Sequence, residues 1–272
     1  RKYQACSRKG DIMINNSIKN TFVTLFVAAT VLLTPVMAPA AGGGVELLDA
    51  PIDINDKESL RRGAKAFADY CYSCHAASVM RFNRIAKDLE MSEDEVREMM
   101  IHTRGKKGDP TKIGELMKVS MTDDYAKNAF GTAVPDLSLT ARARGADWVY
   151  TYLRSFYVDP YRPTGFNNTV FPDVGMPQVL WSLQGLQEPV YKTVMHGNVE
   201  VEELEGFEQI QAGALSRVEY DMFLGDLTNF MVYLAEPVQV ERRSLGWKVL
   251  LFLIVFFGFA YALKKEYWKD VH

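Results

Sequence analysis

The sequence predicts a mainly α-helical domain with long loops, followed by one C-terminal transmembrane helix. Two observations carry this prediction. Apolar residues recur at helical spacing on both sides of a central region rich in proline, glycine and polar residues. Near the C-terminus, residues 245–263 form an almost wholly apolar run that at about 1.5 Å per residue matches the thickness of a bilayer core. We therefore expect one domain of about 200 residues with short appendages.

The composition excludes several classes of protein. Hydrophobic residues make up 48% and charged residues 24% of the 272 residues, which excludes a disordered chain and a polytopic membrane protein. Three cysteines are too few for a disulfide scaffold.

Residues 13–40 are typical of a secretory signal peptide. A polar stretch follows Met13, an apolar run covers residues 22–33, and Ala-Pro-Ala at 38–40 is a small-x-small cleavage pattern. The alternative is an N-terminal transmembrane anchor, but the apolar run is shorter than the roughly 20 residues of a span and is interrupted by Pro35. We assign no function to residues 1–12, and we expect residues 41–240 to form the exported domain.

Four helices are predicted within this domain. Asp56 can cap the first, and one apolar face leads along it into Cys71. Capping boxes begin two others, at Ser92 and Ser216, and we interpret their methionines at 99, 100, 222 and 231 as core residues. An apolar stripe over 148–156 predicts another. The apolar stripe of the helix that begins at Ser216 ends at Glu236-Pro237. Residues 158–215 are expected to form long loops with a short hairpin, which would surround one face of the functional site.

Residues 241–272 are predicted to be the membrane anchor and a short tail. A buried core helix is the alternative for residues 245–263, but no soluble partner sequence follows. The signal peptide places the domain on the exported side, and basic residues behind the span fit a cytoplasmic C-terminus. Residues suited to the interfacial belts or the cytoplasmic flank are Trp247, Lys248, Lys264, Lys265, Tyr267, Trp268 and Lys269. We therefore expect a single-pass protein of a bacterial inner membrane with a periplasmic domain.

The motif that carries chemistry is Cys-Tyr-Ser-Cys-His at residues 71–75. Two thiols at this spacing can add across the vinyl groups of a haem, and the adjacent His75 is then held as an axial ligand. A zinc site would need a second pair of ligands, and a thioredoxin-like pair would need a preceding strand. The motif therefore predicts one covalent haem c, attached through Cys71 and Cys74 in a cytochrome c-like domain.

The second axial ligand is less well defined by local sequence. His102 and His196 are candidates, although a lone histidine is more often a surface or hydrogen-bonded residue. Met176 differs from the other methionines because it lies in a segment, residues 171–177, whose prolines and glycine forbid a helix. Such a loop can present a thioether to the iron, so local sequence favours Met176, with core packing as the alternative reading.

Five elements in order give the chain a recognisable resemblance. They are the C-x-x-C-H motif, Val-Pro-Asp-Leu-Ser at 134–138, Arg-Ala-Arg-Gly-Ala-Asp-Trp at 142–148, Gly-Met-Pro at 175–177, and Ala-Glu-Pro at 235–237 ahead of Arg242, Arg243 and the terminal span. Together they resemble the cytochrome c1 family, the haem c subunits of quinol–cytochrome c oxidoreductases, and the resemblance covers essentially the whole mature chain.

The resemblance implies a role for each matching residue. His75 and Met176 would be the axial ligands, Pro135 would pack near the haem, and an arginine would meet a haem propionate, with Arg144 the first choice and Arg142 the second. Electrons would arrive from a Rieske iron–sulfur protein and leave to a cytochrome c. Cytochrome b would be a further partner in a dimeric complex, and this chain would oxidise no quinol itself. The mature chain has no cysteines left for the disulfide of some lineages.

The net charge of −3 conceals an uneven distribution. Residues 41–240 hold 30 acidic and 20 basic residues, so the domain is acidic and the ends are basic. This excludes nucleic acid as a partner and suits a basic protein. The densest acidic patch is Glu200, Glu202, Glu203, Glu205 and Glu208, which we interpret either as a docking surface or as a solvated loop. Two other functions stay open: a membrane-anchored monohaem cytochrome c of another respiratory complex, and a haem enzyme or sensor with an open distal site.

Overall fold

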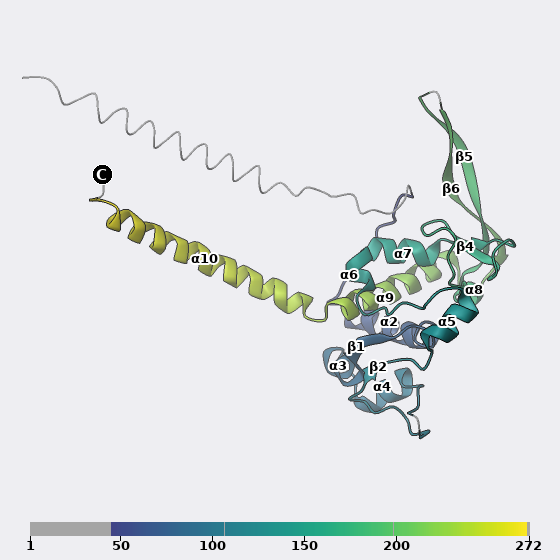
Figure 1. Ribbon diagram of the computed structural model, residues 1–272, viewed down its shortest axis with the longest axis horizontal. Helices are drawn as coiled ribbons and strands as arrows, with labels where there is room; N and C mark the ends of the chain where they lie inside the picture. The colour runs from purple at the N-terminus through teal and green to yellow at the C-terminus, as the bar shows by residue number, and fades with distance from the viewer. Residues whose placement is uncertain (1–44, 106, 198, 271–272) are drawn as a thin grey trace, which may run out of the picture. The chain divides into compact units, whose positions relative to one another are not determined.

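A computed structural model describes residues 45–105, 107–197 and 199–270, and it confirms the mainly helical class (Figure 1). The segments expected to be an upstream piece (1–12) and a signal peptide (13–40) lie outside the described residues. The helices of the domain are α2 (Lys57–Tyr70), α3 (Phe82–Asp88), α4 (Glu93–Met100), α5 (Asp123–Phe130), α6 (Thr140–Arg144), α7 (Ala146–Arg154), α8 (Trp181–Gln184) and α9 (Arg217–Ala235). The strands are β1 (Ala77–Arg81), β2 (Leu116–Met117), β3 (Phe156–Val158), β4 (Phe166–Asn168), β5 (Gly185–His196) and β6 (Val199–Ala212).

The first and last helices of the domain, α2 and α9, pack against each other at its centre. Their closest approach is at Gly63, where an added Cβ would lie 2.1 Å from the carbonyl oxygen of Asp226. The rings of Phe67 and Phe230 meet with centroids 5.6 Å apart, and Asn229 donates to Ser59 Oγ at 3.0 Å. This packing fixes the C-terminal end of α2, which leads into the Cys-x-x-Cys-His motif.

The three predicted helix starts are confirmed. The Asp56 side chain accepts a hydrogen bond from Ser59 N and caps α2. Complete capping boxes begin α4 at Ser92 and α9 at Ser216. In each box the serine satisfies a main-chain N–H of the first turn while a glutamate satisfies the N–H of the serine. Helix α9 ends at Ala235, as predicted from Glu236-Pro237.

The core prediction holds for most of the apolar residues. The four side chains of the predicted α2 face, at residues 60, 64, 67 and 71, are all buried, and so are Met100 and Met231. Met222 is a correction: 65% of it is exposed, because it faces outward from α9, whose opposite side packs on α2. The stripe over 148–156 is also split, since α7 ends at Arg154 and Phe156 begins strand β3.

The central region departs from its prediction. Residues 158–215 contain a long antiparallel hairpin, in which β5 and β6 pair from Gly185 opposite Ala212 to His196 opposite Val199. Two register shifts interrupt it, after Leu186 and after Val190, and each shift breaks the alternation of apolar and polar residues that identifies a strand. The predicted short hairpin was therefore wrong in length. All five glutamates of the acidic patch lie on β6, not in a loop.

Helix α10 (Gln239–Tyr267) follows α9 after a break at residues 236–238. Its 29 residues rise about 44 Å, enough for a bilayer core and one interface. None of its residues is buried, and it is the one helix of the described residues that is long and apolar enough to cross a membrane. The alternative of a buried core helix is therefore excluded, and the span predicted at 245–263 lies entirely within α10.

Candidate functional site

The two cysteines and the histidine lie on a tight turn that continues α2. Cys71 is the residue after the last turn of the helix, and its carbonyl oxygen accepts from Cys74 N at 3.1 Å and from His75 N at 2.9 Å. Both thiols are free, with Cys71 buried and Cys74 half-buried. The turn therefore holds both sulfurs and the imidazole within a single five-residue unit.

The environment of Cys71 argues against a thiol–disulfide exchange site. Burial, and to a smaller extent the neighbouring Cys74, raises the pKa of its thiol to about 12. The free thiol is therefore protonated at neutral pH, whereas the nucleophile of a thiol–disulfide exchange site is a thiolate. In addition, the described residues contain no group of three or more His, Cys, Asp or Glu side chains that could hold a metal ion.

His75 is oriented as an axial ligand requires. Its Nδ1 lies 2.8 Å from the carbonyl oxygen of Pro135. Because a carbonyl oxygen can only accept, Nδ1 carries the proton and donates, which leaves the Nε2 lone pair free for iron. Burial lowers the pKa of His75, and this outweighs the hydrogen bond to Pro135 and the charge of Asp136. The imidazole is neutral, so the residues at this turn fit a covalently attached haem.

The segment that carries Pro135 is tied to the chain after His75 by three hydrogen bonds, and a fourth lies within the segment. Leu137 N donates to Ala76 O at 2.8 Å, and Val79 N donates to Ser138 Oγ at 3.2 Å. The Asp136 carboxylate accepts from Ser78 N at 2.9 Å and from Ser138 N at 2.8 Å. Residues 134–138 thus form a strap that fixes where the Pro135 carbonyl meets the imidazole.

A cavity of about 250 Å³ adjoins the strap and the second cysteine. Its lining comes from the C-x-x-C-H turn, the segment before α5, α5 itself and the strap. The lining residues include Cys74, Ala76, Ser78, Val119, Met121, Ala126 and Val134. The lining also includes Lys118, Thr122, Asp123 and Asp136, so this space beside a half-buried thiol is bounded by both apolar and polar groups.

Met176 lies in the loop between β4 and α8, and a tyrosine hydroxyl contacts its sulfur. Tyr152 Oη donates to Met176 Sδ at 3.4 Å. The Tyr152 ring is stacked on Trp148 with centroids 5.0 Å apart and meets Phe156 edge-on at 5.1 Å. Burial raises the pKa of Tyr152, so its hydroxyl stays protonated and remains a donor. A thioether sulfur has two lone pairs, which leaves one for iron.

Two asparagines hold the Met176 loop in place. Asn168 Oδ1 accepts from Val170 N at 2.9 Å and Phe171 N at 3.1 Å, while its Nδ2 donates to Tyr152 O at 2.7 Å. Asn167 Oδ1 accepts from Asp173 N at 2.9 Å. The two side chains therefore replace the regular backbone pairing that the loop lacks. Sequence reasoning missed the roles of Asn167, Asn168 and Tyr152. The Asn-Asn pair before a proline- and glycine-rich loop is a local signal that could have identified the two asparagines, whereas Tyr152 has no such signal.

The two arginines of residues 142–148 have different partners. Arg144 lies over the Trp148 ring, with its guanidinium carbon 5.0 Å from the ring centroid. Within the described part of the chain it makes no ion pair. Arg142 instead pairs with Glu236 at 3.8 Å, near the start of α10. Arg144 is thus joined through Trp148 and Tyr152 to Met176, whereas Arg142 is occupied at the junction with the membrane helix.

The structure brings His75 together with Pro135 and Met176 together with Tyr152. No hydrogen bond joins the two candidate ligands within the described residues. Of the alternative ligands, His102 is exposed and His196 lies at the end of β5. The candidate residues therefore fall into two groups: the turn after α2 with its strap, and the Met176 loop with the aromatic stack of α7.

The chain is similar to known proteins over most of its length. A sequence profile of the Cytochrome C1 family matches residues 48–189 and 208–271. A cytochrome c1 of Allochromatium vinosum is 48% identical over 91% of this chain and 99% of that protein. A protein of Nitrosomonas europaea named ammonia monooxygenase gamma subunit is 49% identical over 91% of this chain and 98% of its own length. The cytochrome c1 of Blastochloris viridis is 27% identical over 87% of this chain and 91% of that protein.

Proposed function

Because the chain belongs to the cytochrome c1 family, we propose that it passes single electrons from a Rieske iron–sulfur protein, through a haem ligated by His75 and Met176, to a cytochrome c. Membership of the family gives the general function of the chain. The chain is an electron-transfer haem subunit of a respiratory complex, the cytochrome bc1 complex, and it carries covalently bound haem c. The single observation that carries the finer proposal is the contact between His75 Nδ1 and the Pro135 carbonyl oxygen.

On the proximal side, Cys71 and Cys74 would form the thioether bonds and His75 would hold the iron through Nε2. The Pro135 carbonyl fixes the tautomer and prevents the ring from rotating, and the strap over 134–138 fixes the carbonyl. A hydrogen bond to Nδ1 also makes the imidazole more basic, which favours its bond to iron. The proline of the strap therefore acts through its main chain.

On the distal side, Met176 would be the sixth ligand and Tyr152 would be its positioning residue. The hydroxyl of Tyr152 draws electron density from the sulfur, and the aromatic stack limits how far it can move. Arg144 is the first choice for a haem propionate, because its guanidinium lies on Trp148 without an ion-pair partner among the described residues. Arg142 is the second choice, because Glu236 already engages it.

When bound, the haem supplies a one-electron couple, and with both axial positions filled it exchanges electrons without binding oxygen. The chain's residues would then hold both ligands in place in both oxidation states. No residue of this chain is assigned to quinol oxidation, which we place on the other subunits. The chain alone is therefore not an enzyme.

We place the haem domain in the periplasm of a bacterium and the C-terminus in the cytoplasm. Helix α10 makes the chain a single-pass membrane protein. Lysines at 264, 265 and 269 follow the span and support the proposed orientation by the positive-inside rule. In this arrangement the acidic domain faces the compartment in which a basic cytochrome c diffuses, and complementary charge accelerates their encounter.

A second candidate function has one specific observation in its favour. The relative from Nitrosomonas europaea bears the name of a monooxygenase subunit and is as similar as the Allochromatium cytochrome c1. A membrane-anchored monohaem cytochrome c serving another respiratory complex would use the same haem site. Only the donor and the neighbouring subunits would differ.

Purification of the intact complex from its own membranes, through an affinity tag on the C-terminus of this chain, separates the two functions. Our proposal predicts that a dihaem cytochrome b and a Rieske protein co-purify, in a dimeric complex that reduces a cytochrome c with quinol. Recovery of oxidase or monooxygenase subunits without cytochrome b would contradict the first proposal and support the second.

A further inference from the structure

The turn between β3 and β4, residues 159–165, carries an arginine that holds the Met176 loop. Arg162 Nη1 donates to the Asp173 carboxylate at 2.7 Å, and Arg162 Nη2 donates to the Asp173 carbonyl oxygen at 2.8 Å. One guanidinium therefore binds both the side chain and the main chain of a residue that lies three positions before Met176.

Arg162 is itself fixed in the turn. Its main-chain N–H donates to Asp159 O at 3.1 Å, and its carbonyl oxygen accepts from Gly165 N at 2.9 Å. Its side chain is only 27% exposed, and the buried Nε has no hydrogen-bond partner within the described residues. Because an N–H group that leaves water without a partner costs free energy, the two bonds to Asp173 are what stabilise the guanidinium in this position.

The backbone of Asp173 requires such support. Its φ of 62° lies in the left-handed region, which is unfavourable for residues other than glycine, although aspartate adopts it more readily than most. Three hydrogen bonds hold this conformation: the two from Arg162 and one from Asp173 N to Asn167 Oδ1 at 2.9 Å. Asn167 also donates to the Asp159 carboxylate at 2.9 Å, which closes a network between the turn and the Met176 loop.

Beyond Asp173 the loop packs closely on the rest of the domain. The side chain of Val174 is buried. A Cβ added at Gly175 would lie 2.9 Å from the carbonyl oxygen of Phe130, the last residue of α5. Met176 follows directly, so its position depends on the path that the chain takes from Asp173 to Gly175.

We propose that Arg162 is a positioning residue for Met176, which it holds in place by fixing the backbone of Asp173. This inference rests on the proposed function, in which Met176 is an axial ligand. Loss of the guanidinium would let Asp173 leave the left-handed conformation, and Met176 would then leave the iron more often. The carbonyl contact should contribute more than the carboxylate contact, because the Asp173 side chain is 77% exposed and an exposed ion pair is screened by water.

The experiment titrates the oxidised, haem-loaded full-length chain with imidazole and follows the charge-transfer band of a methionine-ligated ferric haem. Imidazole can bind only after Met176 has left the iron. Its apparent dissociation constant therefore falls in proportion as the methionine-free state becomes more populated. We expect Arg162→Gln to lower this constant about tenfold, which corresponds to about 1.4 kcal/mol.

Two conservative variants separate the contacts. Asp173→Asn keeps the carbonyl contact and should lower the constant by less than about fivefold. Arg162→Lys keeps the charge but not the planar guanidinium that reaches both oxygens, so it should restore the original constant only in part. Arg162→Gln should have no further effect in a chain that also carries Met176→Leu, because the ligand that Arg162 positions is then absent.

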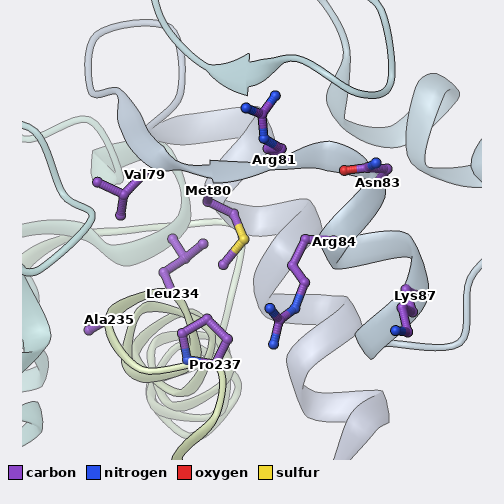
Figure 2. A pocket seen from close by; sticks show the side chains of 9 residues that line it. All are labelled: Val79, Met80, Arg81, Asn83, Arg84, Lys87, Leu234, Ala235 and Pro237. Carbon is purple, nitrogen blue, oxygen red and sulfur yellow. The ribbon is translucent and has the colours of Figure 1, made fainter.

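The matched control is Arg84→Gln. Arg84 also pairs with a single aspartate, Asp88, but it lies on α3 in a groove of about 430 Å³ that is lined by β1, α3 and the junction of α9 with α10 (Figure 2). This substitution should keep the imidazole constant within about twofold of that of the unmodified chain.

Three outcomes would overturn the proposal while leaving Met176 as a ligand. They are an unchanged constant in Arg162→Gln, an equal fall in the Arg84→Gln control, and an effect of Arg162→Gln that persists alongside Met176→Leu. If Arg162→Gln does not retain haem, Arg162→Lys carries the test, and a constant equal to that of the unmodified chain would overturn the proposal. If Met176→Leu alone leaves imidazole binding unchanged, Met176 is not the ligand, and the proposed function fails together with this inference.

Discussion

Replacing Tyr152 with phenylalanine should lower the reduction potential of the haem while leaving its ligands in place. The substitution removes one oxygen, and with it the hydrogen bond to Met176 Sδ at 3.4 Å. That bond draws electron density from the sulfur, so its loss makes Met176 a better donor and favours the ferric state. A hydrogen bond of this kind is worth about 0.5–1 kcal/mol net. For a one-electron couple this corresponds to a fall of about 20–45 mV.

The assay is a spectroscopic redox titration of the full chain, with Tyr150→Phe as the matched control. Tyr150 lies on the same helix and is buried, and within the described residues no hydrogen bond joins its hydroxyl to Met176. The control should keep the original potential, and both variants should keep the charge-transfer band of a methionine-ligated ferric haem. An unchanged potential in Tyr152→Phe, or an equal fall in Tyr150→Phe, would refute the assignment of Tyr152 to the ligand sulfur.

Three further predictions concern the scaffold of the site. Gly63→Ala should destabilise the domain by about 1–3 kcal/mol in chemical denaturation, because the added Cβ would lie 2.1 Å from a carbonyl oxygen of α9. The control Gly246→Ala should leave the stability unchanged, because Gly246 has open space around it. Asn168→Ala should destabilise the folded conformation of the distal loop by about 1–3 kcal/mol, so that carbon monoxide can displace Met176 from the iron. A haem that still does not bind carbon monoxide would count against this role of Asn168. Burial raises the pKa of Asp136, but the hydrogen bonds from Ser78 and Ser138 together outweigh it and hold this pKa below its usual value. The ionised carboxylate therefore stabilises the fold above about pH 4, and this stabilisation is lost as the pH falls further. Asp136→Asn should therefore lower stability by about 1 kcal/mol at pH 7 and by less in acid, and a pH-independent difference would contradict this reasoning.

The parts of the structure that could be predicted from sequence are those encoded by neighbouring residues. The C-x-x-C-H motif needs five consecutive residues, and Asp56, Ser92 and Ser216 act within one helical turn. The apolar run of α10 is also a local property. Each of these signals depends only on neighbouring residues and not on the fold of the rest of the chain.

The features that escaped prediction depend on residues far apart in sequence. Tyr152 and Met176 are 24 positions apart, and no spacing rule joins a helix residue to a loop residue. The length of the β5–β6 hairpin was underestimated because its two register shifts disrupt the alternation on which strand prediction depends. Met222 was placed in the core because helical spacing alone does not say which face of α9 meets α2. The family resemblance implied only that Pro135 would pack near the haem, and the contact of its carbonyl oxygen with His75 Nδ1 was not predicted.

The central claim is that a covalent haem in this chain is held by His75 and Met176. Near-infrared magnetic circular dichroism of the oxidised full-length chain tests it most directly, because histidine–methionine and bis-histidine ligation give separate charge-transfer bands. We predict the histidine–methionine band in the unmodified chain, and its loss together with carbon monoxide binding in Met176→Leu. A bis-histidine band in the unmodified chain, or a spectrum that Met176→Leu does not change, would contradict the account.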